Sequence, residues 1–223
     1  MLVLGIETAT DVCAVGLVDG DRDLADLALL TPRGHSTKLA GLIAAALDAA
    51  GASPSDLGAV AVSAGPGSYT GLRIGASTAK GLCLATGAAL VGVPTMAALA
   101  HTVRGLAFPA TILTALPSRR GEVYAAAFYD TPGGIERQTE DRALALDDIR
   151  EIVPPFDGIR VVGPAAQAVT DALADPSAVV PLATRPSGLA VARLGAALTE
   201  AGETEDLAAF EPAYLKPFVS GGA

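Results

Sequence analysis

The residues best placed to do chemistry lie in one glycine-rich segment, from Gly65 to Gly75, with the sequence GPGSYTGLRIG. Glycines that follow a strand and open a helix can present backbone N–H groups to an anion, and the helix dipole adds to the attraction. The residues that would make this contact are Gly65, Gly67, Ser68, Thr70 and Arg73. However, the glycine spacing is one residue longer than the dinucleotide-binding fingerprint, and there is no phosphate-loop lysine. Two interpretations stay open: a structural turn, and an anion or nucleotide contact in an assembled complex.

Metal and nucleophile chemistry find less support in the sequence. The two histidines, His35 and His101, have no second His or Glu at helical spacing, and Leu39 stands where a second ligand beside His35 would lie. We therefore predict no metal site. Ser68 is not part of a G-x-S-x-G elbow, so its hydroxyl is better suited to capping a helix than to nucleophilic attack.

The remaining acidic candidates are Glu7, at the end of the first expected strand, and the pair Asp19 and Asp21. A carboxylate at the carboxyl edge of a strand often serves a site, but hydrogen bonding within a turn explains these residues equally well. The sequence therefore indicates an enzyme-like scaffold with few reactive groups. We predict no catalytic residue and no cofactor in the isolated chain.

The composition limits the partners. The 223-residue chain carries 24 acidic and 15 basic residues, a net charge of −9, and only 4% aromatic residues. Nucleic-acid binding needs clustered cations, and single strands also need aromatic platforms. Arg119 and Arg120 form the only dense basic pair. Any contact with RNA is therefore expected to be indirect, through another subunit.

The same features bear on the compartment. Cys13 and Cys83 lie far apart in the sequence and are expected to be buried free thiols. The apolar N-terminal run lacks the basic residues of a signal peptide, and the longest apolar stretch, 85–100, is broken by glycine and proline. We expect a soluble cytoplasmic protein without membrane contact.

Hydrophobic periodicity predicts an α/β protein in two related halves. The first half has expected strands at 2–7, 13–19, 24–30, 59–64 and 90–93, with helices at 36–50, 71–86 and 94–103. The order restarts after Gly105, with strands at 110–116, 122–129 and 159–163 and helices at 146–153, 164–174 and 188–201. Mixed sheets covered by helices are the natural architecture. We predict a first lobe of residues 1–104 with about 187–205, a second lobe of 105–186, and a tail of 206–223.

The two long helices carry unusually small, charge-poor faces. On helix 36–50 the face opposite the apolar stripe has Gly41, Ala44 and Ala45, and on helix 71–86 glycine and alanine recur every four residues. Such faces indicate a second packed surface, within the chain or with a partner.

Five segments together resemble the bacterial TsaB (YeaZ-type) family, over positions 2 to about 216. They are Ile6–Thr10, Arg33–Ser36, Gly65–Gly75, Gly121–Tyr124 and Glu211–Leu215. Two positions depart from the family pattern. Glu7 stands where aspartate is common, and Pro117-Ser118-Arg119 stands where D-A-R is frequent.

The resemblance implies a two-lobed fold of the actin, Hsp70 and sugar-kinase (ASKHA) class. It also implies a non-catalytic scaffold for the catalytic paralogue TsaD and the ATPase TsaE, in forming threonylcarbamoyladenosine beside the anticodon of tRNA. Family members pair through their first two helices, which correspond to 36–50 and 71–86 here. The predicted partner-interface residues are therefore Leu39, Leu42, Ile43, Ala46, Gly71, Leu72, Ile74, Gly75 and Ala79. A bare helix face that fits a paralogue can also pair with itself, so a homodimer is expected in isolation. ATP or AMP could lie in the assembled complex. TsaD-like proteins carry a metal-binding H-x-x-x-H, which Leu39 interrupts here. The alternative is an enzyme of the same fold, either an ATP-dependent phosphotransferase or a glycoprotease-like peptidase.

Overall fold

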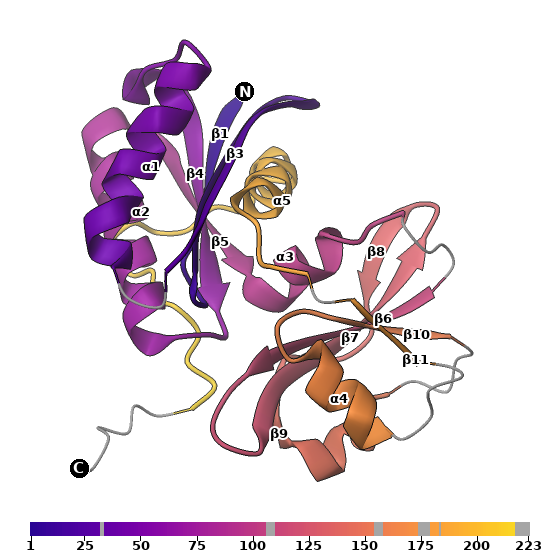
Figure 1. The fold of residues 1–223 in the computed structure, drawn as a ribbon. Coiled ribbons are helices and arrows are strands. Elements are labelled where there is room, and N and C mark those ends of the chain that lie inside the picture. The colour runs from indigo at the N-terminus through magenta and orange to yellow at the C-terminus, as the bar shows by residue number, and fades with distance from the viewer. Residues whose placement is uncertain (32–33, 106–109, 154–157, 174–178, 183, 217–223) are drawn as a thin grey trace, which may run out of the picture.

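The chain forms two lobes, each built around one β-sheet (Figure 1). The computed structural model describes residues 1–31, 34–105, 110–153, 158–173, 179–182 and 184–216. Position 33 of the family motif and positions 217–223 of the predicted tail lie outside these ranges. None of the described helices has both the length and the apolar character needed to cross a membrane.

The larger lobe contains a five-stranded mixed sheet with the order β3-β2-β1-β4-β5. Its strands are β1 (Leu2–Glu7), β2 (Val12–Asp19), β3 (Arg22–Leu30), β4 (Leu57–Gly65) and β5 (Ala89–Pro94). The first three strands form an antiparallel meander, and β4 and β5 continue the sheet parallel to β1. The turn between β2 and β3 is the one expected at Gly20, which adopts a positive φ of 57°.

The smaller lobe repeats this order in a second sheet, β8-β7-β6-β10-β11, with β9 also paired to β7. The strands are β6 (Ala110–Pro117), β7 (Glu122–Thr131), β8 (Gly134–Arg137), β9 (Arg142–Ala145), β10 (Ile159–Val162) and β11 (Val179–Leu182). Again an antiparallel meander comes first and two parallel strands follow. The sequence predicted that the order of elements repeats in the second half, and the structure shows that the two sheets share the same strand topology.

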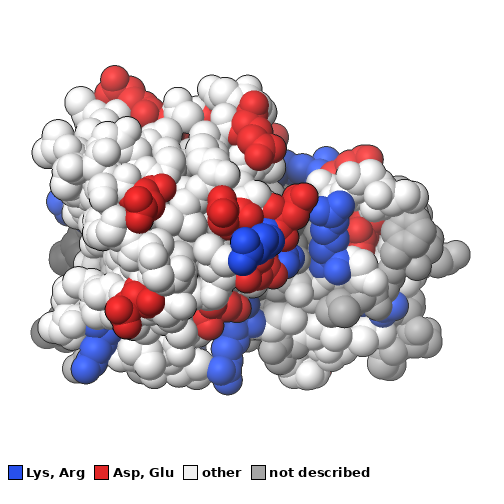
Figure 2. Space-filling view, turned by 90° about the horizontal axis from the view of Figure 1, so that it is seen from above, with Lys and Arg blue, Asp and Glu red and all other residues white. Residues whose placement is uncertain are grey.

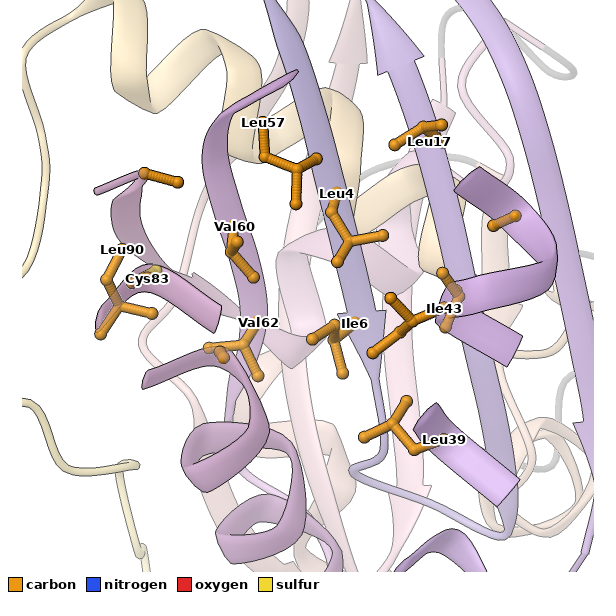
Figure 3. Packing of buried hydrophobic residues seen from close by; sticks show 14 of the residues in the cluster. Leu4, Ile6, Leu17, Leu39, Ile43, Leu57, Val60, Val62, Cys83 and Leu90 are labelled. Atoms are coloured by element: carbon orange, nitrogen blue, oxygen red, sulfur yellow. The ribbon is translucent and has the colours of Figure 1, made fainter. Parts of the chain in front are cut away.

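Helices cover both faces of the larger sheet. On one face lie α1 (His35–Ala49) and α2 (Tyr69–Thr86), and on the other lie α3 (Thr95–His101) and α5 (Gly188–Glu200). Alternation along β1 explains the arrangement. Leu4 and Ile6 pack under α1 and α2 (Figure 3), whereas the side chain of Val3 packs on the other face, under α5. The smaller sheet is covered by α4 (Ala166–Leu173) and the 3-10 helix Leu146–Ile152.

Helix α5 lies in direct backbone contact with the larger sheet. A Cβ atom added at Gly5 of β1 would lie 2.2 Å from the carbonyl oxygen of Gly188, so no side chain fits between them. A chain segment that follows the smaller lobe is therefore built into the larger one. The two crossings between the lobes, after α3 and before α5, contact each other where the Thr102 hydroxyl donates to Thr184 Oγ1 at 3.4 Å.

Most predicted elements are confirmed, and their bounds differ by a few residues. The predicted helix cap is also confirmed, because Ser68 Oγ accepts a hydrogen bond from the N–H of Gly71 at 3.3 Å. Cys13 and Cys83 are buried free thiols, as expected. The sequence did not reveal β8, β9, β11 or the short 3-10 helix Pro54–Asp56.

Candidate functional site

The Gly65–Gly75 segment lies directly against the turn that follows β1. A Cβ atom added at Gly71 would be 2.0 Å from the carbonyl oxygen of Thr8. The Thr8 hydroxyl donates to the carbonyl oxygen of Gly71 at 2.9 Å, and the N–H of Ser68 donates to the carbonyl oxygen of Ala9 at 2.7 Å. The glycines are therefore needed because two backbone segments touch here.

Donors of this loop are bound to acceptors within the chain. The N–H of Gly65 donates to Thr95 Oγ1 at 3.1 Å, and that of Ser68 is bound to Ala9. These two N–H groups are bonded within the isolated chain, and the anion or nucleotide contact of Gly65 and Ser68 in an assembled complex stays a prediction. The structural-turn interpretation accounts for both residues.

The other residues of the predicted anion contact are not gathered at one point. Gly67 and the exposed Ser68 line a cleft between the lobes. Thr70 and Arg73 instead lie on the outer surface of α2, where the Arg73 guanidinium donates to the Tyr69 hydroxyl at 3.1 Å and lies 5.4 Å from the centre of its ring. The structure therefore separates the five residues into two groups.

The predicted partner interface requires a larger correction. Leu39, Ile43 and Ala46 of α1 are buried against the larger sheet, at 1%, 6% and 0% exposure. The same holds for Gly71, Leu72, Gly75 and Ala79 of α2. These seven residues are core residues, and their assignment to a partner interface is wrong. The physical reason is that the wide apolar stripe of an amphipathic helix covers the protein's own sheet first.

Leu42 and Ile74 are half-buried at the edge of the same core, so their interface role stays a prediction. The exposed surface of α1 is the opposite face, which contains Ala40, Gly41, Ala44 and Ala45. On α2 the exposed residues include Ser77, Gly81, Leu84 and Ala85, and Leu84 is 79% exposed. We call these eight residues the outer helix face.

The C-terminal segment covers the glycine-rich loop, a feature the sequence did not indicate. The N–H of Ala213 donates to the carbonyl oxygen of Ala64 at 2.7 Å, and the rings of Tyr214 and Tyr69 have centroids 4.8 Å apart. A Cβ atom at Gly65 would lie 2.4 Å from the Ala213 carbonyl oxygen. The Glu211–Leu215 motif and the Gly65–Gly75 motif are therefore two sides of one contact.

The cleft between the lobes has a volume of about 580 Å³. The turn after β1 contributes Thr10 and Asp11, and the corresponding turn after β6 contributes Ser118 and Arg119. The lining also includes Gly67, Ser68, Tyr124, Thr184 and Arg185. Ser118 Oγ is buried and has no hydrogen-bond partner among the described residues. The cleft can thus orient a polar ligand with hydroxyl and guanidinium groups.

Groups suited to acid–base catalysis are scarce in this lining. Asp11 is its single carboxylate within the described part of the chain. His35 does not line the cleft, and its Nε2 lies 3.2 Å from the carbonyl oxygen of Val12. No group of three potential metal ligands occurs among the described residues.

The sequence did not reveal this cleft, because the cleft is formed by two turns that lie more than 100 positions apart in the chain.

Glu7 is fully buried at the end of β1 and does not line the cleft. One carboxylate oxygen accepts the N–H of Ala9 at 2.7 Å, and the other accepts the hydroxyl of Ser63. Burial raises the pKa of Glu7 to about 7, although both hydrogen bonds act in the opposite direction. Of the interpretations left open for Glu7, hydrogen bonding within the turn is the one the structure shows.

Two repeated lobes, helices on both faces of the larger sheet and a cleft between paired turns define an actin-like fold of the ASKHA class. Residues 29–209 match the family model described as "TsaD: tRNA N6-adenosine threonylcarbamoyltransferase". The chain belongs to this family.

Named relatives refine the comparison. The chain is 34% identical over 149 residues to "tRNA threonylcarbamoyladenosine biosynthesis protein TsaB" of Escherichia coli, a match that covers 67% of this chain and 64% of that protein. A protein of the same name from Bacillus subtilis is 29% identical over 157 residues, or 70% of this chain and 68% of the relative. The match thus spans about two thirds of the length of each relative.

Among solved structures, "YeaZ from Pseudomonas aeruginosa" superposes with a TM-score of 0.83 at 24% identity, covering 96% of this chain and 99% of that one. This likeness shows a shared fold. With the named relatives, it confirms the resemblance to the TsaB (YeaZ-type) family.

Proposed function

We propose that the chain is an accessory subunit in the formation of threonylcarbamoyladenosine in tRNA. In this role it binds a TsaD-type catalytic subunit and stabilises its active conformation. The observation that carries the proposal is the outer helix face, which is exposed, small and poor in charge in a chain of the TsaD family. The names of the TsaB relatives support the pathway.

The outer helix face has the properties of a helix-packing surface. On α1, Ala40 with Ala44 and Gly41 with Ala45 repeat at a spacing of four, which places each pair on one side of the helix. Small side chains allow the axes of two helices to approach to about 8 Å, the short end of the usual range. Leu84 adds an exposed apolar side chain that a partner could enclose. We propose a paralogous helix pair as the occupant.

The chemistry in this proposal belongs to the partner. The complex transfers a threonylcarbamoyl group from its AMP adduct to the adenosine beside the anticodon. Glu7 is enclosed in the core and Asp11 is the one carboxylate in the described cleft lining, so this chain offers little to an acid–base reaction. A TsaE-like ATPase and an ATP or AMP molecule in the assembled complex complete the proposal.

The acidic chain is expected to meet tRNA only through the catalytic partner. In the absence of that partner, the outer helix face is expected to pair with a second copy of this chain. A weak, concentration-dependent homodimer follows from the proposal. Sedimentation of the isolated chain over a range of concentrations measures it.

Reconstitution of the transfer tests the function. Purified TsaD-type subunit, TsaE-type subunit, threonylcarbamoyl-AMP and unmodified tRNA are combined with and without this chain, and modified adenosine is measured. The proposal expects modification only when the chain is present. Modification that is equally fast without it would overturn the accessory role. Assays of the isolated chain for ATP turnover and peptide hydrolysis test the alternative, and activity that is retained through repeated purification would favour it.

A further inference from the structure

A second cavity, of about 700 Å³, lies where the two crossings between the lobes meet α5. Arg104 comes from the crossing that follows α3, Arg185 from the crossing that precedes α5, and Arg193 from α5 itself. The remaining lining consists of Asp26, His101, Thr102, Gly105, Ser187, Leu189, Ala190, Leu194 and Ala197. Of these residues, only Arg185 also lines the first cleft.

The ionisable side chains that line this cavity are mostly positive, whereas the chain as a whole is negative. The chain has a net charge of −9, whereas the described lining combines three arginines with one carboxylate, Asp26. Figure 2 shows Lys and Arg side chains gathered with acidic ones near the junction of the lobes. Such a concentration of cations in an acidic protein attracts anions to one place.

The carboxylates near this cavity are already engaged, and one of them, Asp130, accepts the N–H of the lining residue Gly105 at 2.9 Å. Asp26 accepts hydrogen bonds from the N–H of Leu189 and the hydroxyl of Ser187, at the start of α5. Arg193 Nε donates to Asp23 at 2.9 Å, so this guanidinium is paired. By contrast, Arg104 and Arg185 form no ion pair with any described residue. Two guanidinium groups are therefore left to bind an anion.

His101 forms part of the wall and reports on its electrostatics. The pKa of His101 is lowered to about 4, mainly by burial and then by the charges of Arg104 and Arg193, against the opposing effect of Asp130. The imidazole is thus neutral at pH 7 and can still donate one hydrogen bond. His101 therefore adds a hydrogen-bond donor to the cavity wall and no negative charge that would repel an anion.

We propose that this cavity binds a small phosphate-bearing anion, held between Arg104 and Arg185. Guanidinium groups bind phosphate oxygens in pairs, and the cavity volume lies within the range of small-ligand sites. Leu189 and Leu194 of α5 give one wall an apolar surface, on which a nucleoside could rest. An anion bound there connects the two crossings and restrains the lobes relative to each other.

Isothermal titration of the full chain with inorganic pyrophosphate and, separately, with AMP tests the site. Either ligand is expected to bind, and Arg104→Gln or Arg185→Gln is expected to weaken binding about tenfold or more, since each removes a charge-assisted contact. Arg120→Gln is the matched control, because Arg120 is exposed and lines neither cavity. Thermal unfolding of each variant checks that it is folded. Tighter binding of AMP would assign a nucleoside phosphate, and tighter or equal binding of pyrophosphate would assign the phosphate group alone.

The first cleft provides a second control. Arg119 lines that cleft and is not part of the second cavity, so Arg119→Gln is expected to bind pyrophosphate and AMP like the unaltered chain. The proposal is overturned if neither probe binds saturably. It is also overturned if Arg119→Gln weakens binding while Arg104→Gln does not, because the ligand then lies in the first cleft.

Discussion

Gly75 of α2 lies so close to Thr8 that a Cβ atom added at Gly75 would be 2.4 Å from Thr8 Oγ1. The same hydroxyl donates to the carbonyl oxygen of Gly71, one helical turn earlier. The glycine-rich motif therefore fastens α2 to the turn after β1. This contact fixes the position from which α2 presents its outer side.

Replacing Gly75 with alanine is expected to destabilise the protein. The new methyl group would meet Thr8 Oγ1 and, at 3.2 Å, Val62 Cγ2. Overpacking of this kind costs about 1–3 kcal/mol of unfolding free energy. Chemical denaturation of Gly75→Ala measures the loss.

Gly81→Ala is the matched control for this change, because the same helix has open space around an added Cβ at position 81. Its stability is expected to rise by about 1 kcal/mol from helix propensity alone. Equal stabilities for the two variants would contradict the packing of α2 on Thr8.

The buried carboxyl group of Glu7 predicts a pH dependence of stability. Its pKa is about 7 in the folded chain and 4.5 when unperturbed, so between these values the unfolded chain loses the proton first. The free energy of unfolding therefore falls as the pH rises from 4.5 to 7, by on the order of 3 kcal/mol in all, and levels off above.

Glu7→Gln removes this ionisation but keeps an acceptor for the N–H of Ala9. At pH 8 the variant is expected to be more stable than the unaltered chain, and at pH 4.5 the difference should vanish. Asp26 and Asp141 have raised pKa values as well, and they remain in both proteins. Denaturation at a series of pH values tests the idea, and parallel stability curves would refute it.

The C-terminal contact predicts that Tyr214 holds the glycine-rich loop in place. Tyr214→Ala removes the ring that packs on Tyr69, a contact of about 0.5–1.5 kcal/mol. Amide hydrogen exchange at Ser68, whose N–H is bound to Ala9, is expected to accelerate. Leu215→Ala changes the neighbouring exposed side chain and should leave this exchange rate unaltered. An unchanged rate in Tyr214→Ala would show that the tail does not secure the loop.

Hydrophobic periodicity in the sequence predicted most of the helices and strands, because each long element of the fold buries one face and exposes the other. The strands β8 and β9 were missed because each has four residues and neither has the run of β-branched residues that revealed the equally short β10. The helix stripe of Leu39 and Ile43 was recognised, yet it was assigned to a partner when the chain's own sheet covers it. The cleft and the second cavity join residues far apart in sequence, such as Asp11 with Arg119 and Arg104 with Arg185. No local pattern encodes such pairs.

The central claim is that the outer helix face binds the TsaD-type subunit, and the affinity between the two purified proteins tests it most directly. Ala44→Glu places a charge on that face, and Ala168→Glu makes the same change on the exposed side of α4 in the smaller lobe. We predict that Ala44→Glu weakens binding at least tenfold, about 1.4 kcal/mol, because a buried unpaired carboxylate is costly. Ala168→Glu should bind like the unaltered chain. Equal affinities for both variants and the unaltered chain would contradict the account.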